Sequence, residues 1–373
     1  MKADHMNEID SLVKKACGMM LDYSAPGLKR RIKNMIKRML GRKVAERNFI
    51  SWPCGLCALG RVEYLKAYPQ GKHAKTVAVS IESFFDRWIE NGSRIARVED
   101  VLAGYVLLEY INVMSPEKEE YLHAADLFSD YLNDARKDAQ GTYVYNPLQK
   151  ENIVLADMLG MVCPFLAKKH NGISDSENAI LQIRNFVENS YDPGTGLLYH
   201  GYEYIDGKAE KTGIVGWGRT MGWSLMGICL ALDEMTPGTE GYELLRDYLM
   251  RLTFALRRYL RPDGLFSWQL TQKGPEDTSG SAMIAYSLQK AINSRVFTPD
   301  DRDIYESACN IVSRVHDSLK GYITEEGNVE GTLSECLGPG IHPQKYGSYP
   351  WSVGPTLALL SIYDDTSPKE ANI

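Results

Sequence analysis

The chain has 373 residues, of which 44% are hydrophobic and 24% are charged, and its formal net charge is -6. These values are close to the average for globular proteins and exclude a chain that is disordered over its whole length. The acidic balance argues against a broad nucleic-acid interface, which needs an excess of Lys and Arg on one face. We therefore expect a folded protein with no nucleic-acid partner.

The one strongly basic stretch lies between Lys29 and Lys43. Its apolar residues recur at helical spacing, which leaves the charges on the opposite side. We interpret 1–45 as a basic N-terminal helical segment with a solvated charged side; a patch that binds a membrane surface or a polyanion is the alternative. No apolar run reaches the roughly 18 residues needed to span a bilayer, and the N-terminus lacks the hydrophobic region of a signal peptide. The sequence thus predicts a cytoplasmic protein without a membrane partner.

Six short segments rich in Gly or Trp, or holding an isolated carboxylate, each precede an apolar helix. Between Trp52, Gly104, Asp157, Arg219, Ser279 and Ser352 the gaps are 52, 53, 62, 60 and 73 residues. Each gap accommodates two helices of average length with their connections. Six helical hairpins in a row predict an all-α fold that closes into a ring, as a single domain over 1–373. Polar residues at the starts of the inner helices would then converge on a central pocket.

Two loops, 191–216 and 320–349, are long for a compact domain, and loops of this length usually carry function. In the first loop, residues 197–202 could form a short strand before Asp206 and Gly207 turn the chain back.

Seven cysteines are spread mostly through apolar, helical parts of the sequence. An odd number scattered in this way is typical of reduced, buried thiols and not of a disulfide framework. The seven histidines show no metal-ligand spacing, such as two His four residues apart on a helix. We expect no metal and no other cofactor.

The most unusual segment is GWGRTMGW at 216–223. Trp217 and Trp223 offer flat apolar faces, and Arg219 offers a planar fork for a carboxylate. This combination suits a sugar acid, and a packed helix start with a solvent-facing Arg is the alternative. Trp52 and Trp351, at two other helix starts, could add stacking faces, or they could serve core packing only.

Three more polar residues are candidates for chemistry. Asp157 is an isolated carboxylate in apolar sequence, and it is either a helix N-cap or a proton donor. Asp100 beside Glu99 could be a second functional carboxylate, or the acidic pair could simply favour a helix N-terminus. His200, in a long loop, could contact a ligand, or it could be a surface or core histidine.

Four segments together resemble the unsaturated rhamnogalacturonyl hydrolases of glycoside hydrolase family 105 and, more distantly, the unsaturated glucuronyl hydrolases of family 88. The segments are WPCGL at 52–56, DML at 157–159 with PFLA at 164–167, GLLYHG at 196–201 and WGRTMGW at 217–223. Each is modest alone, but their order and spacing are specific. The resemblance covers about 52–363.

This resemblance implies an (α/α)6 barrel and a glycosidase that hydrates the C4=C5 double bond of an unsaturated uronic acid left by a polysaccharide lyase. The hydrated sugar opens and frees its neighbour, so the expected partner is a short oligosaccharide from pectin's rhamnogalacturonan. The implied catalytic residues are Asp157, as acid and base, and Asp100, although Glu99 could take the second place. The expected substrate contacts are His200, Arg219 near the uronate carboxylate, and the aromatic walls Trp217, Trp223, Trp52 and Trp351.

The chain departs from the family pattern at Thr220 and Met221, where the family usually has Gly and Asn. This change leaves the preference for a galacturonyl or a glucuronyl substrate open.

Two other functions stay open on sequence grounds. An epimerase or isomerase of the acylglucosamine type can share the fold, but that class relies on histidines at inner-helix ends, and the six openings contain none. A non-catalytic carbohydrate-binding helical-repeat protein seldom needs isolated acids at helix starts. The expected assembly is a monomer or a small homo-oligomer.

Overall fold

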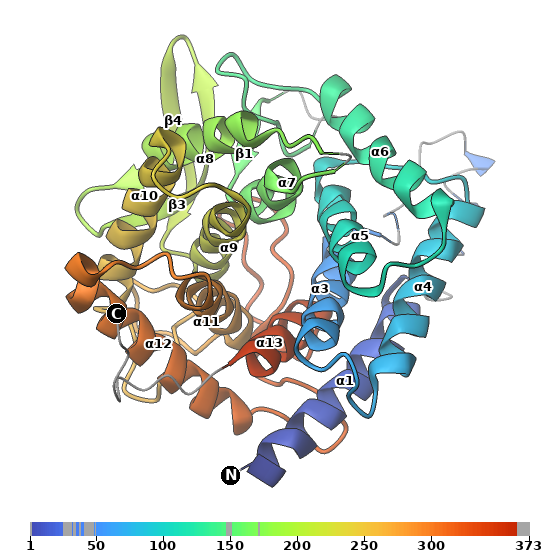
Figure 1. Cartoon of the computed structure of the whole chain (residues 1–373). Coiled ribbons are helices and arrows are strands. Elements are labelled where there is room, and N and C mark those ends of the chain that lie inside the picture. Colours follow the sequence, from blue (N-terminus) through green and yellow to red (C-terminus); the bar gives the residue numbers. More distant parts are fainter. Residues whose placement is uncertain are drawn as a thin grey trace.

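The computed structural model describes residues 2–24, 32, 35–36, 39–40, 48, 50–146, 151–170 and 172–363. Within these residues, twelve α-helices form two concentric layers (Figure 1). The inner helices are α3 (Trp52–Ala67), α5 (Val101–Met114), α7 (Asp157–Ala167), α9 (Gly218–Glu234), α11 (Thr278–Asn293) and α13 (Pro350–Ile362). Each packs against the next, and α13 packs against α3, so the ring closes. The predicted (α/α)6 barrel is confirmed. The expected basic helix between Lys29 and Lys43 falls mostly outside the described residues.

The outer layer covers the ring with amphipathic helices. They are α4 (Ala74–Glu90), α6 (Glu119–Asp134), α8 (Ser176–Ser190), α10 (Glu240–Leu256), α12 (Arg302–Lys320) and α1 (Lys2–Ser24). In α12, for example, Ala308, Ile311, Val315 and Leu319 recur at helical spacing and are buried. Helix α1 packs against α13 and α3, so helices from the two ends of the chain make up the sixth hairpin (Figure 1).

The inner helices begin at or close to the six predicted openings. Helix α9 begins at Gly218 and α13 at Pro350, so these two openings already belong to the helices. Gly and Pro lower helix propensity in general, yet Pro suits the first turn. A Cβ on Gly222 would lie 2.7 Å from the Cβ of Met283 in α11. Gly222 lies within α9, and its lack of a side chain allows α9 and α11 to pack closely.

A small antiparallel sheet completes the fold. The predicted strand and turn at 197–207 are confirmed as a hairpin of β3 (Leu197–Ile205) and β4 (Lys208–Val215). The sequence did not predict β1 (Ile153–Leu155) and β2 (Tyr191–Asp192), which also pair with β3. A second pair, β5 (Thr332–Leu333) with β6 (Tyr346–Gly347), lies in the long loop before α13. Two short 3-10 turns, η1 (Val98–Asp100) and η2 (Pro299–Asp301), precede α5 and α12.

Charged side chains gather near the C-terminal ends of the inner helices. This C-terminal ion network consists of Glu63, Lys66, Glu109, Lys168, Asp233, Glu234 and Lys290. The Nζ of Lys168 lies 2.6 Å from Glu109 Oε1 and 2.5 Å from Glu234 Oε1, and the Nζ of Lys290 lies 2.8 Å from Asp233 Oδ2. Cations near helix C-termini also suit the helix dipole. The network therefore lies at the end of the ring opposite to the N-terminal ends of the inner helices.

The seven cysteines are all free thiols; four are buried, as predicted, and Cys17, Cys309 and Cys336 are partly exposed. Burial raises the pKa of Cys57 to about 12, so its thiol stays protonated and unreactive near neutral pH. Among the described residues, no helix is long and apolar enough to cross a bilayer.

Candidate active site

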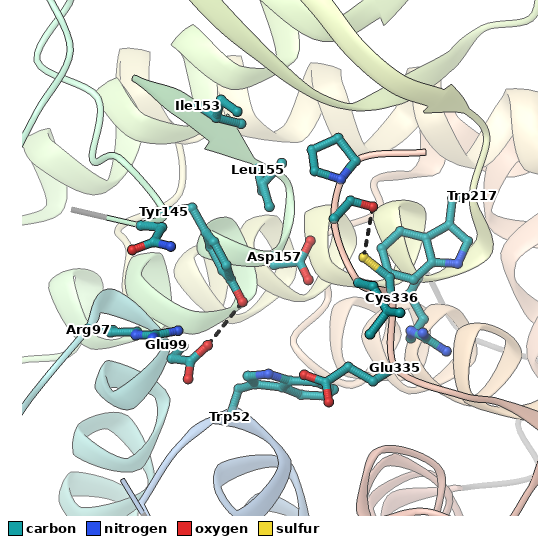
Figure 2. A pocket seen from close by; sticks show the side chains of 15 residues that line it. Trp52, Arg97, Glu99, Tyr145, Ile153, Leu155, Asp157, Trp217, Glu335 and Cys336 are labelled. Atoms are coloured by element: carbon teal, nitrogen blue, oxygen red, sulfur yellow. Dashed lines mark hydrogen bonds between the residues drawn. The ribbon is translucent and has the colours of Figure 1, made fainter. Parts of the chain in front are cut away.

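A pocket of about 210 Å³ lies at the N-terminal ends of the inner helices (Figure 2). Its lining residues are Trp52, Arg97, Glu99, Tyr145, Asn146, Ile153, Leu155, Asp157, Trp217, Arg219 and the loop residues Glu335, Cys336, Leu337, Gly338 and Pro339. Pockets for drug-sized ligands measure roughly 300 to 1,000 Å³. The smaller volume suits a single sugar ring.

Asp157 is the first residue of α7, and its carboxylate faces the middle of the pocket (Figure 2). It is only 9% exposed, and its Oδ2 lies 3.1 Å from Nε2 of His200. The N-cap position belongs to Ala156, and no side-chain cap is formed. Of the two interpretations that the sequence left open, the structure therefore rejects the N-cap. The start of α7 also places the carboxylate at the positive end of the helix dipole.

Strand pairing brings His200 to Asp157. Strand β1 runs directly into α7, and the backbone N–H of Ala156 donates to the carbonyl of His200 at 3.0 Å. The β3–β4 ladder has a bulge between Tyr199 and Gly201, and bulges commonly redirect a side chain beside an active site. On β4, Gly213 has a φ of 78°, and a Cβ there would lie 2.7 Å from the Cβ of His200. Only glycine leaves room for the imidazole.

His200 is fully buried and is not among the residues that line the pocket. The edge of its ring meets Trp217, with centroids 4.5 Å apart, and Nδ1 has no hydrogen-bond partner. A proton on Nε2 suits this arrangement, since Nε2 then donates to Asp157 and no donor is left without an acceptor. His200 is therefore placed to position the Asp157 carboxylate.

We expect His200→Phe to lower kcat by about 100-fold with little change in KM, because a misplaced catalytic group costs about this much. Phenylalanine keeps the planar ring but cannot hydrogen-bond to Asp157. His200→Gln, which retains a donor, should recover part of the loss. Tyr204→Phe, further along β3, removes only a hydrogen bond to the carbonyl of Gly207 and serves as the matched control. An unchanged kcat in His200→Phe would contradict the positioning role.

The second carboxylate in the pocket belongs to Glu99 and not to Asp100. Glu99 lines the pocket, and its Oε2 accepts a hydrogen bond from Tyr145 Oη at 3.1 Å. Asp100 is 1% exposed, and its Oδ2 accepts from the backbone N–H groups of Ala96 at 2.8 Å and Arg97 at 3.3 Å. Burial outweighs these hydrogen bonds and raises the pKa of Asp100 to about 6. These hydrogen bonds let Asp100 shape the turn before α5.

Arg219 lines the pocket, but its guanidinium is already engaged by the protein. Its Nη1 contacts Asp277 Oδ2 at 3.4 Å, Ser279 Oγ at 3.2 Å and the carbonyl of Leu333 at 2.8 Å, while Nη2 donates to the carbonyl of Ser334 at 2.7 Å. Arg219 thus ties α9 to α11 and to the loop that supplies one pocket wall.

Of the four tryptophans predicted to form aromatic walls, two line the pocket and two pack behind a lining residue. Trp52 and Trp217 line the pocket. Trp223 and Trp351 are each 1% exposed and do not line it. Both pack against Trp52, with ring centroids 5.9 and 5.1 Å away, and Trp351 donates its indole N–H to the carbonyl of Leu333 at 3.1 Å. Both therefore support Trp52, which lines the pocket.

Sequence reasoning missed Arg97, Tyr145 and the individual residues of 335–339 that line the pocket. The length of the 320–349 loop indicated a functional role, and this loop supplies the third pocket carboxylate, Glu335. Nothing in the sequence around Tyr145 indicated that it would line the pocket. Although three carboxylates line the pocket, the described residues hold no group of three or more His, Cys, Asp or Glu arranged for a metal ion.

Solved structures share this fold. A possible member of the GH105 family from Salmonella enterica serovar Paratyphi A is 19% identical with a TM-score of 0.77, covering 97% of this chain and 94% of that one. A possible GH105 member from Klebsiella pneumoniae is 18% identical with a TM-score of 0.78, covering 97% and 93%. The unsaturated glucuronyl hydrolase of Bacillus sp. GL1 is 16% identical with a TM-score of 0.69, covering 95% and 96%. At these identities the likeness shows the fold alone.

Curated proteins give no match to the sequence. The sequence profile of Glycosyl Hydrolase Family 88, by contrast, matches residues 28–361, which is nearly the whole chain. This match agrees with the resemblance carried by the four sequence segments. The chain belongs to glycosyl hydrolase family 88.

Proposed function

We propose that the protein is an unsaturated uronyl hydrolase that acts on short oligosaccharides left by a lyase on pectin's rhamnogalacturonan. The observation that carries the proposal is the Asp157 carboxylate, held by buried His200 in a pocket with the volume of one sugar ring. Membership of family 88 and the resemblance to family 105 supply the substrate class.

In the proposed reaction, the acid form of Asp157 donates a proton to C4 of the unsaturated uronate. A water molecule attacks C5 and gives its proton back to the Asp157 carboxylate, so one residue serves as acid and base. A C4–H bond and a C5–O bond form, and the double bond is lost. The hemiketal at C5 then opens, and the hemiacetal this exposes at C1 releases the neighbouring sugar. Ordinary glycosidases instead need two carboxylates that flank the glycosidic bond.

The remaining site residues take supporting roles in this proposal. Glu99 is the second carboxylate near the reacting carbons, and Trp52 and Trp217 are the walls against which the sugar lies. His200 positions Asp157, and Arg219 holds the loop wall in place.

We also propose a cytoplasmic location. The seven free thiols support it, since reduced cysteines are typical of a reducing compartment.

The test is loss of the ultraviolet absorbance of the conjugated double bond. Unsaturated galacturonyl-rhamnose should lose its absorbance when incubated with the protein, and unsaturated glucuronyl disaccharides in the same panel measure the preference. Product analysis should show release of the second sugar. Unchanged absorbance with every unsaturated uronide, from protein that melts cooperatively, would refute the proposal.

A further inference from the structure

Two arginines line the pocket, and they differ in how their charge is used. Arg219 lies 3.4 Å from Asp277 and also contacts two backbone carbonyls, so its charge is offset and its orientation is fixed. Arg97 comes from the turn before α5 and is half-buried. In the part of the chain that the structure describes, no carboxylate lies within 4.0 Å of its guanidinium, and that group makes no side-chain hydrogen bond.

Three other side chains in the pocket carry carboxyl groups. Glu99, Asp157 and Glu335 all line it, and the charge of Arg219 is taken up by Asp277. A uronate that enters this pocket brings one more negative charge close to three carboxylates. The uronate carboxylate therefore needs a cationic side chain whose N–H groups are not already bonded to the protein. Among the described lining residues, Arg97 meets this condition.

We propose that Arg97, and not Arg219, binds the carboxylate of the uronic acid and selects acidic over esterified substrates. This inference rests on the proposed function. A planar guanidinium can hold a carboxylate through two parallel hydrogen bonds. Figure 2 shows Arg97 and Glu99 on one side of Asp157 and Trp217 on the other. A carboxylate at Arg97 thus places the sugar ring across Asp157, with its remaining atoms toward Trp217.

The kinetic test compares an unsaturated galacturonyl disaccharide with its C6 methyl ester, which has lost the negative charge. In Arg97→Met we expect KM for the acid to rise about 10-fold or more, as for loss of a charge-assisted hydrogen bond. KM for the ester should change by no more than about 2-fold, and Arg97→Lys should recover part of the affinity for the acid. Arg94→Met is the matched control, because Arg94 lies three residues earlier, is exposed and does not line the pocket.

A binding measurement separates this inference from the proposed reaction. Calorimetry with saturated galacturonic acid needs no turnover, and it compares Asp157→Asn with the Asp157→Asn/Arg97→Met double variant. We expect Kd to rise about 10-fold or more on loss of Arg97. If the wild type consumed no unsaturated uronide but Kd still rose on loss of Arg97, the proposed reaction would be refuted and the carboxylate site at Arg97 would be supported. If Arg97→Met weakened acid and ester equally, or left the affinity for the acid unchanged, the assignment of Arg97 would be overturned.

Discussion

Replacing Asp157 by asparagine is expected to lower kcat toward unsaturated uronides by about 10⁴-fold, at the upper end of what a general acid or base contributes. The upper end applies because the same carboxylate would give a proton to C4 and take one from water. Asparagine has nearly the same shape and can still accept a hydrogen bond from Nε2 of His200. The fold should therefore survive, and the melting temperature should stay within a few degrees of the wild type. Absorbance kinetics and a thermal melt measure the two quantities.

Asp206→Asn is the matched control for this change. Asp206 is exposed at the tip of the β3–β4 hairpin, the same hairpin that carries His200, and its φ of 49° is a conformation that asparagine adopts well. The control should keep wild-type kcat. Near-normal turnover in Asp157→Asn would mean that another carboxylate in the pocket, Glu99 or Glu335, performs the proton transfers.

The ring could be predicted from the sequence because of where its inner helices lie. A helix surrounded by other helices is apolar on all sides, so its start stands out as a short run of Gly, Trp or a lone acid before apolar sequence. The same pattern does not fix the first residues of α9 and α13, which are Gly218 and Pro350. Tertiary packing decided these boundaries, and packing is not visible in a local pattern.

The site was predicted less completely, since its geometry depends on contacts between distant segments. Asp157 was identified because no other charge lies near it in the sequence. The choice between Glu99 and Asp100 depends on the 3-10 turn that precedes α5, which sets which neighbour faces inward. His200 was found, but its role required the pairing of β1 with β3.

The C-terminal ion network leads to the largest expected effect on stability, in Glu63→Gln. Glu63 is buried, accepts a hydrogen bond from Tyr286 Oη at 3.0 Å and pairs with Lys66 at 3.4 Å. Removing one partner of a buried ion pair typically costs about 3 to 5 kcal/mol, because the remaining charge loses its counter-ion. We expect the lower end, about 3 kcal/mol at pH 7, since the Lys66 side chain is 28% exposed and keeps its pairing with Glu109. Thermal or denaturant unfolding measures the change.

The pH dependence of this loss distinguishes charge from packing. Burial alone would raise the pKa of Glu63, but the ammonium groups of Lys290 and Lys66, with the Tyr286 hydrogen bond, outweigh it and hold the pKa below its usual value of 4.5. The unfolded chain therefore binds this proton more tightly than the folded protein. The contribution of Glu63 to stability is complete above about pH 4.5 and is lost as the pH falls through the folded-state pKa.

The difference in free energy of unfolding between wild type and Glu63→Gln should accordingly be constant between pH 6 and 8 and shrink below about pH 4.5. Glu90→Gln, at the exposed end of α4, is the control and should stay within about 0.5 kcal/mol of the wild type. Because the network lies at the opposite end of the inner helices from Asp157, folded Glu63→Gln should retain wild-type kcat. A stability difference that persisted undiminished to pH 3 would mean that Glu63 acts through its packing and not through its charge.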